Sequence, residues 1–358
     1  MSRVASANGA DDALAALFLP FSTAALTLPE DGHVLFLRAR AGRWIQDWPH
    51  AKFSCEQTFK PFADELARAG RPVMGSSREQ ATARSQQALV LVLPPRQREE
   101  ARALLARAVR AAAPAGVVVA SVANNAGARS AEADLERLAG SIHSLSKQKC
   151  RVFWTSLPEA AVDWKLVDEW ATLDTPQPIA DGRFVSRPGL FAWDRVDTAS
   201  ALLASQLPVT LSGRGADLGA GYGYLAAELL RRCPRVTAID LYEAEQRALE
   251  PARINLANAT RDCARDVAVD YFWHDVTTGL VRQYDVIVSN PPFHQGRADQ
   301  PVLGQAFIVA AANALAPDGR LWLVANRHLP YEAMLAAHFG AVHSVVVQDG
   351  FKIIEASK

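Results

Sequence analysis

The chain has 358 residues, which is too long for one ordinary domain and long enough for two domains that each bury a core. Hydrophobic residues make up 49% and charged residues 21%, as in ordinary globular proteins, and no apolar run reaches the roughly 18 residues that would cross a bilayer. Lys plus Arg and Asp plus Glu each number 38, so the zero net charge argues against a protein that coats nucleic acid non-specifically.

The N-terminal residues lack the basic start and apolar core of a secretion signal, so we expect a soluble, cytoplasmic protein. Four cysteines are scattered along the chain: Cys55, Cys150, Cys233 and Cys263. They form no Cys-x-x-Cys pair and have no histidine at ligand spacing. We therefore expect neither a disulfide framework nor a bound metal.

The first half alternates apolar strands with a helix. Short apolar runs at His33–Leu37, 88–93 and 116–120 predict strands. The Ala, Arg and Leu pattern of residues 98–113 predicts a helix between the last two runs. This order is typical of an α/β domain with parallel strands. No glycine-rich loop follows a strand here, so we expect the rhythm of a nucleotide-binding fold without its ligand loop.

The end of the first half predicts a helix capped by Ser130 and a strand over residues 147–157. Residues 172–182 carry prolines and a glycine among small polar residues, which is linker composition. We therefore expect a first domain over residues 1–175 and a second over residues 183–358.

The second half has a glycine-rich loop between a short strand, residues 214–217, and a helix, residues 224–232. The loop is Asp217-Leu-Gly219-Ala-Gly221-Tyr-Gly223. Glycines let the backbone turn tightly and let a ligand approach the main chain. By itself this loop fits NAD as well as S-adenosylmethionine, because it also matches the dinucleotide fingerprint.

The next two predicted strands end in polar residues. Residues 236–240 form an apolar run that ends at Asp240, about 20 residues after the loop begins, the spacing at which a carboxylate accepts hydrogen bonds from ribose hydroxyls. Residues 267–273 lead to His274 and Asp275, where an adenine amino group needs an acceptor. A helix cap is the competing interpretation for Asp240, and an ordinary strand-end histidine for His274.

A fourth apolar run, residues 285–289, leads into Asn290-Pro291-Pro292-Phe293. Two consecutive prolines remove two backbone donors, so the strand must stop there. The Asn290 side-chain oxygen and the Pro291 carbonyl can accept the two N–H groups of an exocyclic nucleobase amine, while Phe293 stacks on the ring. A stiff turn without a ligand is the competing interpretation, and we expect His294 to line the site rather than act as a base.

The remaining residues predict a helix at 302–315, a strand at 320–325, a helix at 331–338 and a final hairpin of strands at 342–348 and 351–355. A parallel sheet that ends in an antiparallel pair departs from the dinucleotide dehydrogenase pattern and matches the methyltransferase sheet. We therefore predict an α/β fold.

With the glycine loop, the acidic strand end and Ser-Asn-Pro-Pro-Phe-His-Gln-Gly in this order, residues 183–358 resemble class I S-adenosylmethionine methyltransferases that act on amino groups. Three segments, Pro188–Phe191, Asn290–Gly296 and Ala325–Tyr331, resemble the guanine-N2 ribosomal RNA methyltransferases of the RsmC and RlmG type. Ala220 stands where that family often has cysteine, and the loop needs only a small residue there.

In the first half, Asn125–Glu132 is similar to the N-terminal domain of RsmC, a degenerate methyltransferase copy. The resemblance implies two tandem Rossmann-like methyltransferase domains: a degenerate first domain for RNA recognition or support, and a catalytic second domain. It implies a methyl donor held at Asp217, Gly219, Gly221, Gly223, Asp240, His274 and Asp275, and a flipped guanine at Asn290, Pro291, Pro292 and Phe293.

The implied reaction is methylation of a guanine N2 amine in ribosomal RNA. The resemblance favours the small-subunit (16S) RNA as substrate, and the large-subunit (23S) RNA is the alternative. Arg297, Arg327 and Lys352 are candidates for single phosphate contacts. We expect a monomer that binds ribosomal RNA or a ribosomal subunit and no membrane. Adenine-N6 or protein glutamine-N5 methylation remain alternatives, because such enzymes also use Asn-Pro-Pro before an aromatic residue. A non-catalytic RNA-binding assembly factor is the alternative from another class.

Overall fold

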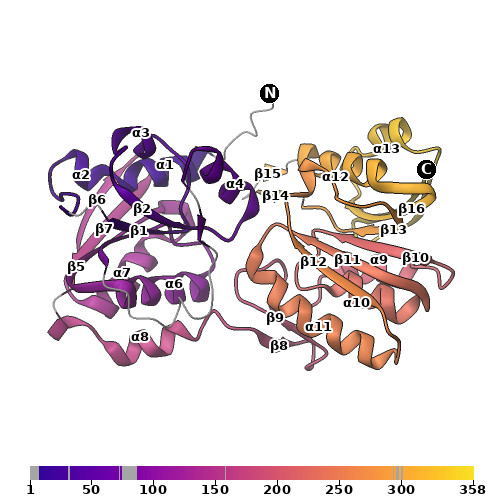
Figure 1. Ribbon diagram of the computed structural model, residues 1–358, viewed down its shortest axis with the longest axis horizontal. Coiled ribbons are helices and arrows are strands. Elements are labelled where there is room, and N and C mark those ends of the chain that lie inside the picture. The colour runs from indigo at the N-terminus through magenta and orange to yellow at the C-terminus, as the bar shows by residue number, and fades with distance from the viewer. Residues whose placement is uncertain are drawn as a thin grey trace. The chain divides into compact units, whose positions relative to one another are not determined.

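The computed structural model describes residues 8–30, 33–71, 73–74, 87–157, 159–292, 294–295, 298–299 and 301–358. It divides into two compact units, Met1–Thr175 and Pro176–Lys358, which Figure 1 shows coloured along the chain. Within the described residues, no helix is both long and apolar enough to span a membrane.

The described helices of the first unit are α1 (Asn8–Leu17), α2 (Leu19–Ser22), α3 (Trp44–Asp47), α4 (Lys60–Arg68), α6 (Arg98–Ala111), α7 (Ala128–Ala139) and α8 (Trp164–Ala171). Its described strands are β1 (His33–Leu37), β2 (Lys52–Glu56), β3 (Val73–Met74), β4 (Gln87–Val92), β5 (Ala112–Ala123), β6 (His143–Lys147) and β7 (Cys150–Ser156). These strands form one sheet in the order β3-β2-β1-β4-β5-β7-β6, in which β7 and β6 run antiparallel to their neighbours.

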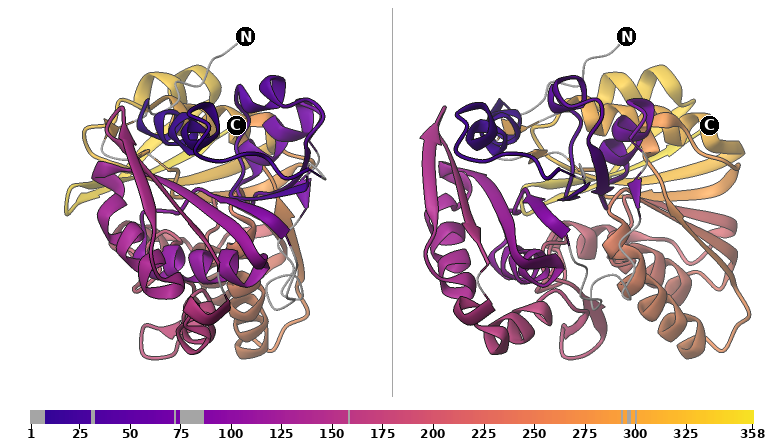
Figure 2. Two further views of the ribbon diagram at one scale, coloured as in Figure 1. Left: turned by 90° about the vertical axis from the view of Figure 1, so that its left-hand side faces the viewer. Right: turned by 60° about the vertical axis from the view of Figure 1, so that its left-hand side comes forward.

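Alternate residues of the central strands fill the two faces of this sheet. Leu35 of β1 and Val90 of β4 belong to the core under α6, α7 and α8, whereas Val34 and Leu89 belong to the core under α1, α3 and α4. Figures 1 and 2 show helices on both sides of the sheet. Burial on both faces explains why the sequence shows continuous apolar runs instead of an alternating pattern.

The end of the first unit differs from the prediction in two places. Residues 147–157 do not form one strand, because Gln148 and Lys149 have positive φ angles of 50° and 59° and turn the chain between β6 and β7. The predicted cap Ser130 lies inside α7, which begins at Ala128 after Gly127 with φ of 98°. A left-handed turn made without glycine gives little warning in the sequence.

The described helices of the second unit are α9 (Thr198–Gln206), α10 (Tyr224–Arg232), α11 (Leu249–Asp262), α12 (Pro301–Ala314) and α13 (Glu332–His338). Its main strands are β10 (Ser212–Leu218), β11 (Arg235–Glu243), β12 (Ala268–Trp273), β13 (Tyr284–Ser289), β16 (Leu315–Asn326), β17 (Ala341–Gln348) and β18 (Phe351–Ser357). Two short pairs stand apart from them: β8 (Gln177–Ile179) with β9 (Phe184–Ser186), and β14 (His294–Gln295) with β15 (Ala298–Asp299).

The second sheet has the order β12-β11-β10-β13-β16-β18-β17, which repeats the order of the first strand by strand. As predicted, its parallel strands end in an antiparallel pair, β18 with β16 and β17 with β18. Helices α9, α10 and α11 contribute to the core on one face, and α12 and α13 to the core on the other (Figure 1). The chain is therefore an α/β protein with two tandem sheets of the same topology.

The repeat places Leu93-Pro94-Pro95 after β4 where the second unit has Asn290-Pro291-Pro292 after β13. It also places Arg38 directly after β1, where the second unit has Gly219 after β10. Arg38 forms an ion pair with Glu100 at 3.2 Å. The first unit thus keeps the architecture without the glycine loop and without the asparagine.

The second unit already begins at Pro176, and residues 176–182 contribute to its structure. Strand β8 pairs with β9, and Ile179 is 7% exposed in the core that also contains Phe184. Burial of an isoleucine side chain stabilises a fold by about 1.5–3 kcal/mol.

We predict that a fragment of residues 176–358 folds cooperatively and that a fragment of residues 183–358 is less stable by about this amount. Urea unfolding compares the two fragments, and equal midpoints would contradict the role given to β8.

Candidate functional site

The glycine loop and the Asn-Pro-Pro segment leave the second sheet side by side. Leu218 at the end of β10 and Ser289 at the end of β13 are partners in the parallel register. The Ser289 hydroxyl donates to the Leu218 carbonyl at 2.8 Å. The next residues, Gly219 and Asn290, therefore both start from the carboxyl edge of the sheet, where open α/β sheets bind their ligands.

The three glycines of the loop have positive φ angles of 73° at Gly219, 54° at Gly221 and 83° at Gly223. A Cβ at Gly219 would lie 3.3 Å from the Phe307 ring and 4.0 Å from Cδ of Pro292, and a Cβ at Gly223 would lie 2.7 Å from a methyl carbon of Leu256. A Cβ at Gly221 would meet no described atom within 4 Å. The loop is thus packed at both ends and open at its centre, where a ligand can approach the backbone.

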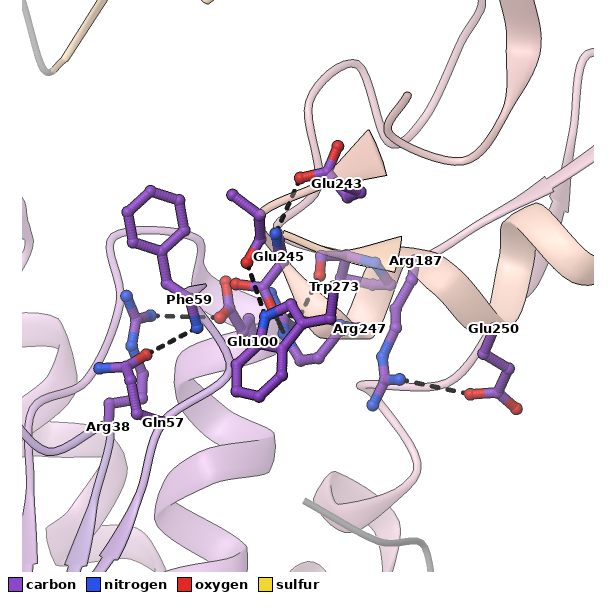
Figure 3. A network of polar contacts seen from close by, with 12 residues as sticks. Arg38, Gln57, Phe59, Glu100, Arg187, Glu243, Glu245, Arg247, Glu250 and Trp273 are labelled. Atoms are coloured by element: carbon purple, nitrogen blue, oxygen red, sulfur yellow. Dashed lines mark hydrogen bonds and ion pairs between the residues drawn. The ribbon is translucent and has the colours of Figure 1, made fainter. Parts of the chain in front are cut away.

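Glu243, the last residue of β11, holds the open part of the loop. Its Oε2 accepts the Gly221 amide at 2.7 Å, and its Oε1 accepts the Glu245 amide at 2.8 Å. Figure 3 shows Glu243 with Glu245, and beside them Trp273, whose indole N–H donates to the Ala244 carbonyl at 2.9 Å. Burial raises the pKa of Glu243 from its ordinary value. Each carboxylate oxygen can accept a further hydrogen bond.

The side chain of Asn255 in α11 holds the backbone of the glycine loop. Its side-chain amide donates to the Tyr222 carbonyl and to the Val185 carbonyl, both at 2.8 Å, and accepts the Val185 amide at 2.7 Å. The residue is 1% exposed. A buried amide that satisfies three backbone groups fixes the loop to α11 and to the β8–β9 pair.

Asp217 lies at the base of the loop and is 1% exposed. Its Oδ2 accepts the Ala226 amide at 2.9 Å, and its Oδ1 is buried without a hydrogen-bond partner among the described residues. Burial raises the pKa of Asp217 to about 7. An unsatisfied buried carboxylate oxygen is costly, so this atom calls for a donor that the described part of the chain does not supply.

Asp240 does not end its strand as predicted, because β11 continues through Leu241 and Tyr242 to Glu243. The Asp240 carboxylate is fully buried and accepts from Arg214 at 3.0 Å, from Arg282 at 2.9 Å and from the Tyr284 hydroxyl at 2.7 Å. These three donors engage both oxygens of the Asp240 carboxylate inside the sheet. The strand-end position expected of a ribose-binding carboxylate belongs to Glu243 instead.

His274 and Asp275 follow β12 at the same edge. A ring nitrogen of His274 lies 2.6 Å from the Gly279 carbonyl, and the ring packs edge-on against Tyr242 at 5.4 Å. Asp275 caps the next short turn, with Oδ1 accepting from the amide and hydroxyl of Thr277 at 2.9 and 2.7 Å. The His274 ring thus contacts the backbone of the turn that follows β12. Asp275 lies at the sheet edge and is partly exposed.

Asn290 is held by the helix that precedes the sheet. Its Nδ2 donates to Oδ2 of Asp197 at 3.0 Å and to Oγ of Ser200 at 2.9 Å. Asp197 is the N-cap of α9, where the same Oδ2 accepts the Ser200 amide at 2.8 Å. The Tyr222 hydroxyl donates to the Arg195 carbonyl at 3.1 Å, so the segment before α9 contacts both the glycine loop and Asn290.

The other predicted acceptor-site residues follow Asn290. Pro291 is buried and Pro292 is exposed, close to Gly219. Phe293 lies outside the described residues, and so does the side chain of His294.

The three predicted phosphate contacts have different outcomes. Lys352 is 6% exposed, and its amine contacts the Leu329 carbonyl at 2.6 Å and the Glu332 carboxylate. The prediction that Lys352 contacts RNA is therefore wrong, because the amine is buried and occupied. Arg327 is exposed after β16, and Arg297 lies outside the described residues.

Sequence reasoning missed Glu243, Asn255, Asp197 and Ser200. The apolar pair Leu241-Tyr242 would have extended the strand to Glu243, and Asp197 before Thr-Ala-Ser is a helix-start pattern. The contact between Asp197 and Asn290 joins residues far apart in the sequence, so no local pattern reveals it.

The chain resembles known methyltransferases over most of its length. Residues 181–355 match the family model of the methyltransferase small domain. The chain is 37% identical over 183 residues to ribosomal RNA small subunit methyltransferase C of Pseudomonas aeruginosa (strain LESB58), a match that covers 51% of this chain and 53% of the relative. The chain therefore matches about half of the length of this relative.

A longer match joins the chain to the protein of the same name from Serratia proteamaculans (strain 568), with 31% identity over 265 residues, 74% of this chain and 72% of the relative. Among solved structures, the T. thermophilus 16S rRNA N2 methyltransferase RsmC, in complex with AdoMet and guanosine, superposes with a TM-score of 0.76. That match covers 97% of this chain and 92% of the other at 24% identity, which shows a shared fold across both units. Together with its glycine loop and Asn-Pro-Pro segment, the Serratia match shows that the chain belongs to the ribosomal RNA small subunit methyltransferase C family.

Proposed function

We propose that this protein transfers a methyl group from S-adenosylmethionine to the exocyclic N2 amine of a guanine in ribosomal RNA, namely the 16S RNA of the small subunit. The observation that carries the proposal is the position of Asn290. Its amide nitrogen is engaged by Asp197 and Ser200, which leaves its oxygen as an acceptor beside the open glycine loop. The small subunit is taken from the names of the curated relatives, and guanine from the RsmC structure, which contains guanosine.

The residues around the glycine loop fit S-adenosylmethionine. The unsatisfied Oδ1 of Asp217 suits the ammonium group of the methionine part, and the space over Gly221 admits a ligand against the backbone. Glu243 has acceptor capacity for the ribose hydroxyls. Asp275 is the candidate for the adenine amine. When bound, the cofactor supplies an electrophilic methyl group on a sulfonium.

The guanine amine is a poor nucleophile, because its lone pair is delocalised into the ring. The Asn290 oxygen and the Pro291 carbonyl are proposed to accept its two N–H groups and to direct the nitrogen lone pair at the methyl group. Orientation of this kind can contribute on the order of 7–11 kcal/mol, and the same acceptors stabilise the more positive amine of the transition state. The proposed acceptors hold the amine in position, and the proton leaves to water without a strong base.

A flipped base must leave its stack, which costs about a few kcal/mol and is largely offset if Phe293 stacks on it at about 1–3 kcal/mol. With zero net charge, the chain depends on local contacts to hold RNA. Arg327 is the described candidate for a phosphate contact, since it is exposed at the carboxyl end of β16.

The substrate is tested by mapping N2-methylguanine in ribosomal RNA of a deletion strain that carries either the unaltered gene or the Asn290→Ala variant. We expect a small-subunit N2-methylguanine to be missing in the deletion strain, restored by the unaltered gene and not restored by Asn290→Ala. A missing large-subunit methylguanine, methyladenine or methylglutamine would overturn the small-subunit guanine assignment. No missing methyl group at all would favour a non-catalytic assembly factor.

The two carboxylates of β11 give a matched pair of variants. Glu243→Gln removes a charged acceptor at the strand end, so we predict about tenfold to hundredfold weaker S-adenosylmethionine binding with little change in stability. Asp240→Asn leaves two guanidinium groups without their buried partner, so we predict a loss of about 1–3 kcal/mol in the free energy of unfolding. Calorimetric titration and urea unfolding measure both quantities. Weaker binding by Asp240→Asn without a loss of stability would return the ribose role to Asp240.

The raised pKa of Asp217, about 7, makes cofactor binding depend on pH. A protonated Asp217 cannot pair with an ammonium group, and each pH unit below the pKa reduces the ionised fraction about tenfold. We predict that affinity for S-adenosylmethionine is about tenfold lower near pH 6 than near pH 7.5, with proton release on binding at the lower pH. Asp217→Asn should bind weakly with no such dependence.

The same carboxyl has the opposite effect on folding stability. Between about pH 4 and pH 7 the folded chain holds a proton on Asp217 that the unfolded chain has lost, so the contribution of this group to stability falls as the pH rises through that range. For the binding prediction above, an affinity for S-adenosylmethionine that is unchanged from pH 6 to 7.5 would contradict the proposed contact between Asp217 and the ammonium group.

A further inference from the structure

Asp197 and Ser200 contact the acceptor asparagine from a different element of the fold, and the proposed function uses them only as the partners of its amide nitrogen. Both lie at the start of α9, and both accept a hydrogen bond from the same atom, Nδ2 of Asn290. We propose that this pair is a positioning device that fixes the orientation of the Asn290 amide, and through it the choice of a base that carries an amine. The inference rests on the proposed methylation of guanine.

The first step of the argument is the chemistry of the contact. An asparagine side chain has a donor end and an acceptor end of nearly the same shape, and either end can turn toward a neighbour. A carboxylate only accepts hydrogen bonds. With Oδ2 of Asp197 at 3.0 Å, Asn290 must present its NH2 group to Asp197, because the reversed amide would set two oxygens against each other.

The second step is the rigidity of the carboxylate. Asp197 is the N-cap of α9, and its Oδ2 also accepts the Ser200 amide at 2.8 Å. The carboxylate is therefore tied to the backbone of the helix that it caps. Ser200 is 8% exposed, and Ala199 and Leu203 of the same helix are buried in the core with the glycine-loop residues Ala220 and Tyr222. The orientation of the Asn290 amide is thus fixed by a helix that is packed in the core, not by a mobile side chain.

The third step is the consequence for the base. With its nitrogen engaged twice, Asn290 offers only its oxygen to a ligand. An exocyclic amine satisfies that oxygen, whereas a ring carbonyl in the same place would leave two acceptors facing each other. A site built to accept from an N–H group rejects an analogue that lacks it. Asp197 and Ser200 therefore act on specificity through Asn290, without contact with the base.

Exchange of the two side chains tests this device. Asn290→Asp places a second carboxylate against Asp197, so we expect kcat for methyl transfer to ribosomal RNA to fall about a hundredfold. In the double variant Asp197→Asn with Asn290→Asp, the amide at position 197 turns its NH2 group to the carboxylate at position 290, and an acceptor oxygen again faces the base. This rotation gives up the Ser200 amide, which the same Oδ2 position accepts, so we expect the double variant to lose about 0.5–2 kcal/mol of stability with the helix cap. We expect the double variant to recover at least about tenfold in kcat over Asn290→Asp.

Several measurements separate positioning from a structural role. Asparagine caps helices as well as aspartate does, so Asp197→Asn keeps the cap, and thermal unfolding should stay close to that of the unaltered protein. Cofactor affinity should also be unchanged, since neither side chain belongs to the glycine loop. Asp194→Asn is the matched control on the same segment: Asp194 is half exposed and pairs with Arg195 at 2.7 Å, and its loss should leave kcat unchanged.

Ser200→Ala provides a second test that introduces no charge. It removes one of the two acceptors of Nδ2, and we expect kcat to fall about threefold to tenfold with the cofactor affinity and the melting temperature unchanged.

The outcomes distinguish the inference from the proposed function. A double variant no more active than Asn290→Asp, together with an unaffected Ser200→Ala, would overturn the positioning role while the unaltered protein still methylates guanine. Absence of guanine methylation by the unaltered protein would overturn the proposed function and this inference with it. Recovery of kcat in the double variant, with unchanged cofactor affinity and no loss of stability beyond that of the helix cap, supports the positioning role.

Discussion

The parallel pairing of β10 with β13 is the constraint on which the rest of the site depends. Leu218 and Ser289 are register partners, so the residues that follow them emerge at the same edge of the sheet. At this edge one chain segment must turn sharply into a helix and the other must stop pairing, and the glycines of the loop and the prolines after Asn290 satisfy these two demands. A slip of one residue in this pairing would turn every side chain of one strand to the opposite face and would separate the two motifs.

Two buried carboxylates, Asp217 and Asp240, and the partly buried Glu243 show that surroundings, not residue type, decide a role. Asp240 has two guanidinium partners and a phenol, and it stabilises the sheet. Glu243, three residues on, accepts two backbone amides at the mouth of the loop. Asp217 has one backbone donor and one unsatisfied oxygen; burial raises its pKa, and the unsatisfied oxygen gives it the capacity for a ligand. Burial without a full set of partners is costly for stability and is a feature of functional sites.

The sequence was sufficient for the fold and for the positions of the two motifs at strand ends, because both follow from local patterns. Continuous apolar runs give the parallel strands, and the loop and the Asn-Pro-Pro segment fall at strand ends that their own glycines and prolines define. The errors have two physical causes. A buried charge such as Asp240 looks like a strand end when its partners Arg214 and Arg282 are distant in sequence, and a long amine such as that of Lys352 looks like a surface cation until its burial is known.

The contacts of Asp197 and Asn255 could not be predicted, because their partners are distant in the sequence. Asp197 is recognisable as a helix cap, yet its second hydrogen bond, to Asn290, depends on how α9 packs against the sheet. Asn255 is an ordinary polar residue of a helix in the sequence, although in the structure it fixes the backbone at Tyr222 and Val185. Such contacts are set by tertiary packing, which no short window of residues contains.

The repetition of one strand order in both units has a consequence for how the chain folds. Two sheets with the same topology in one chain offer each strand a structurally similar wrong neighbour, and misassembly of this kind is a characteristic failure of repeated domains. Synthesis from the N-terminus lets the first sheet complete its pairing before β10 to β18 exist. Divergence of the two units then acts as protection. Leu37 leads into Arg38 where Leu218 leads into Gly219, and Leu93 precedes its two prolines where Asn290 precedes Pro291, so strands exchanged between the units would end in the wrong turns.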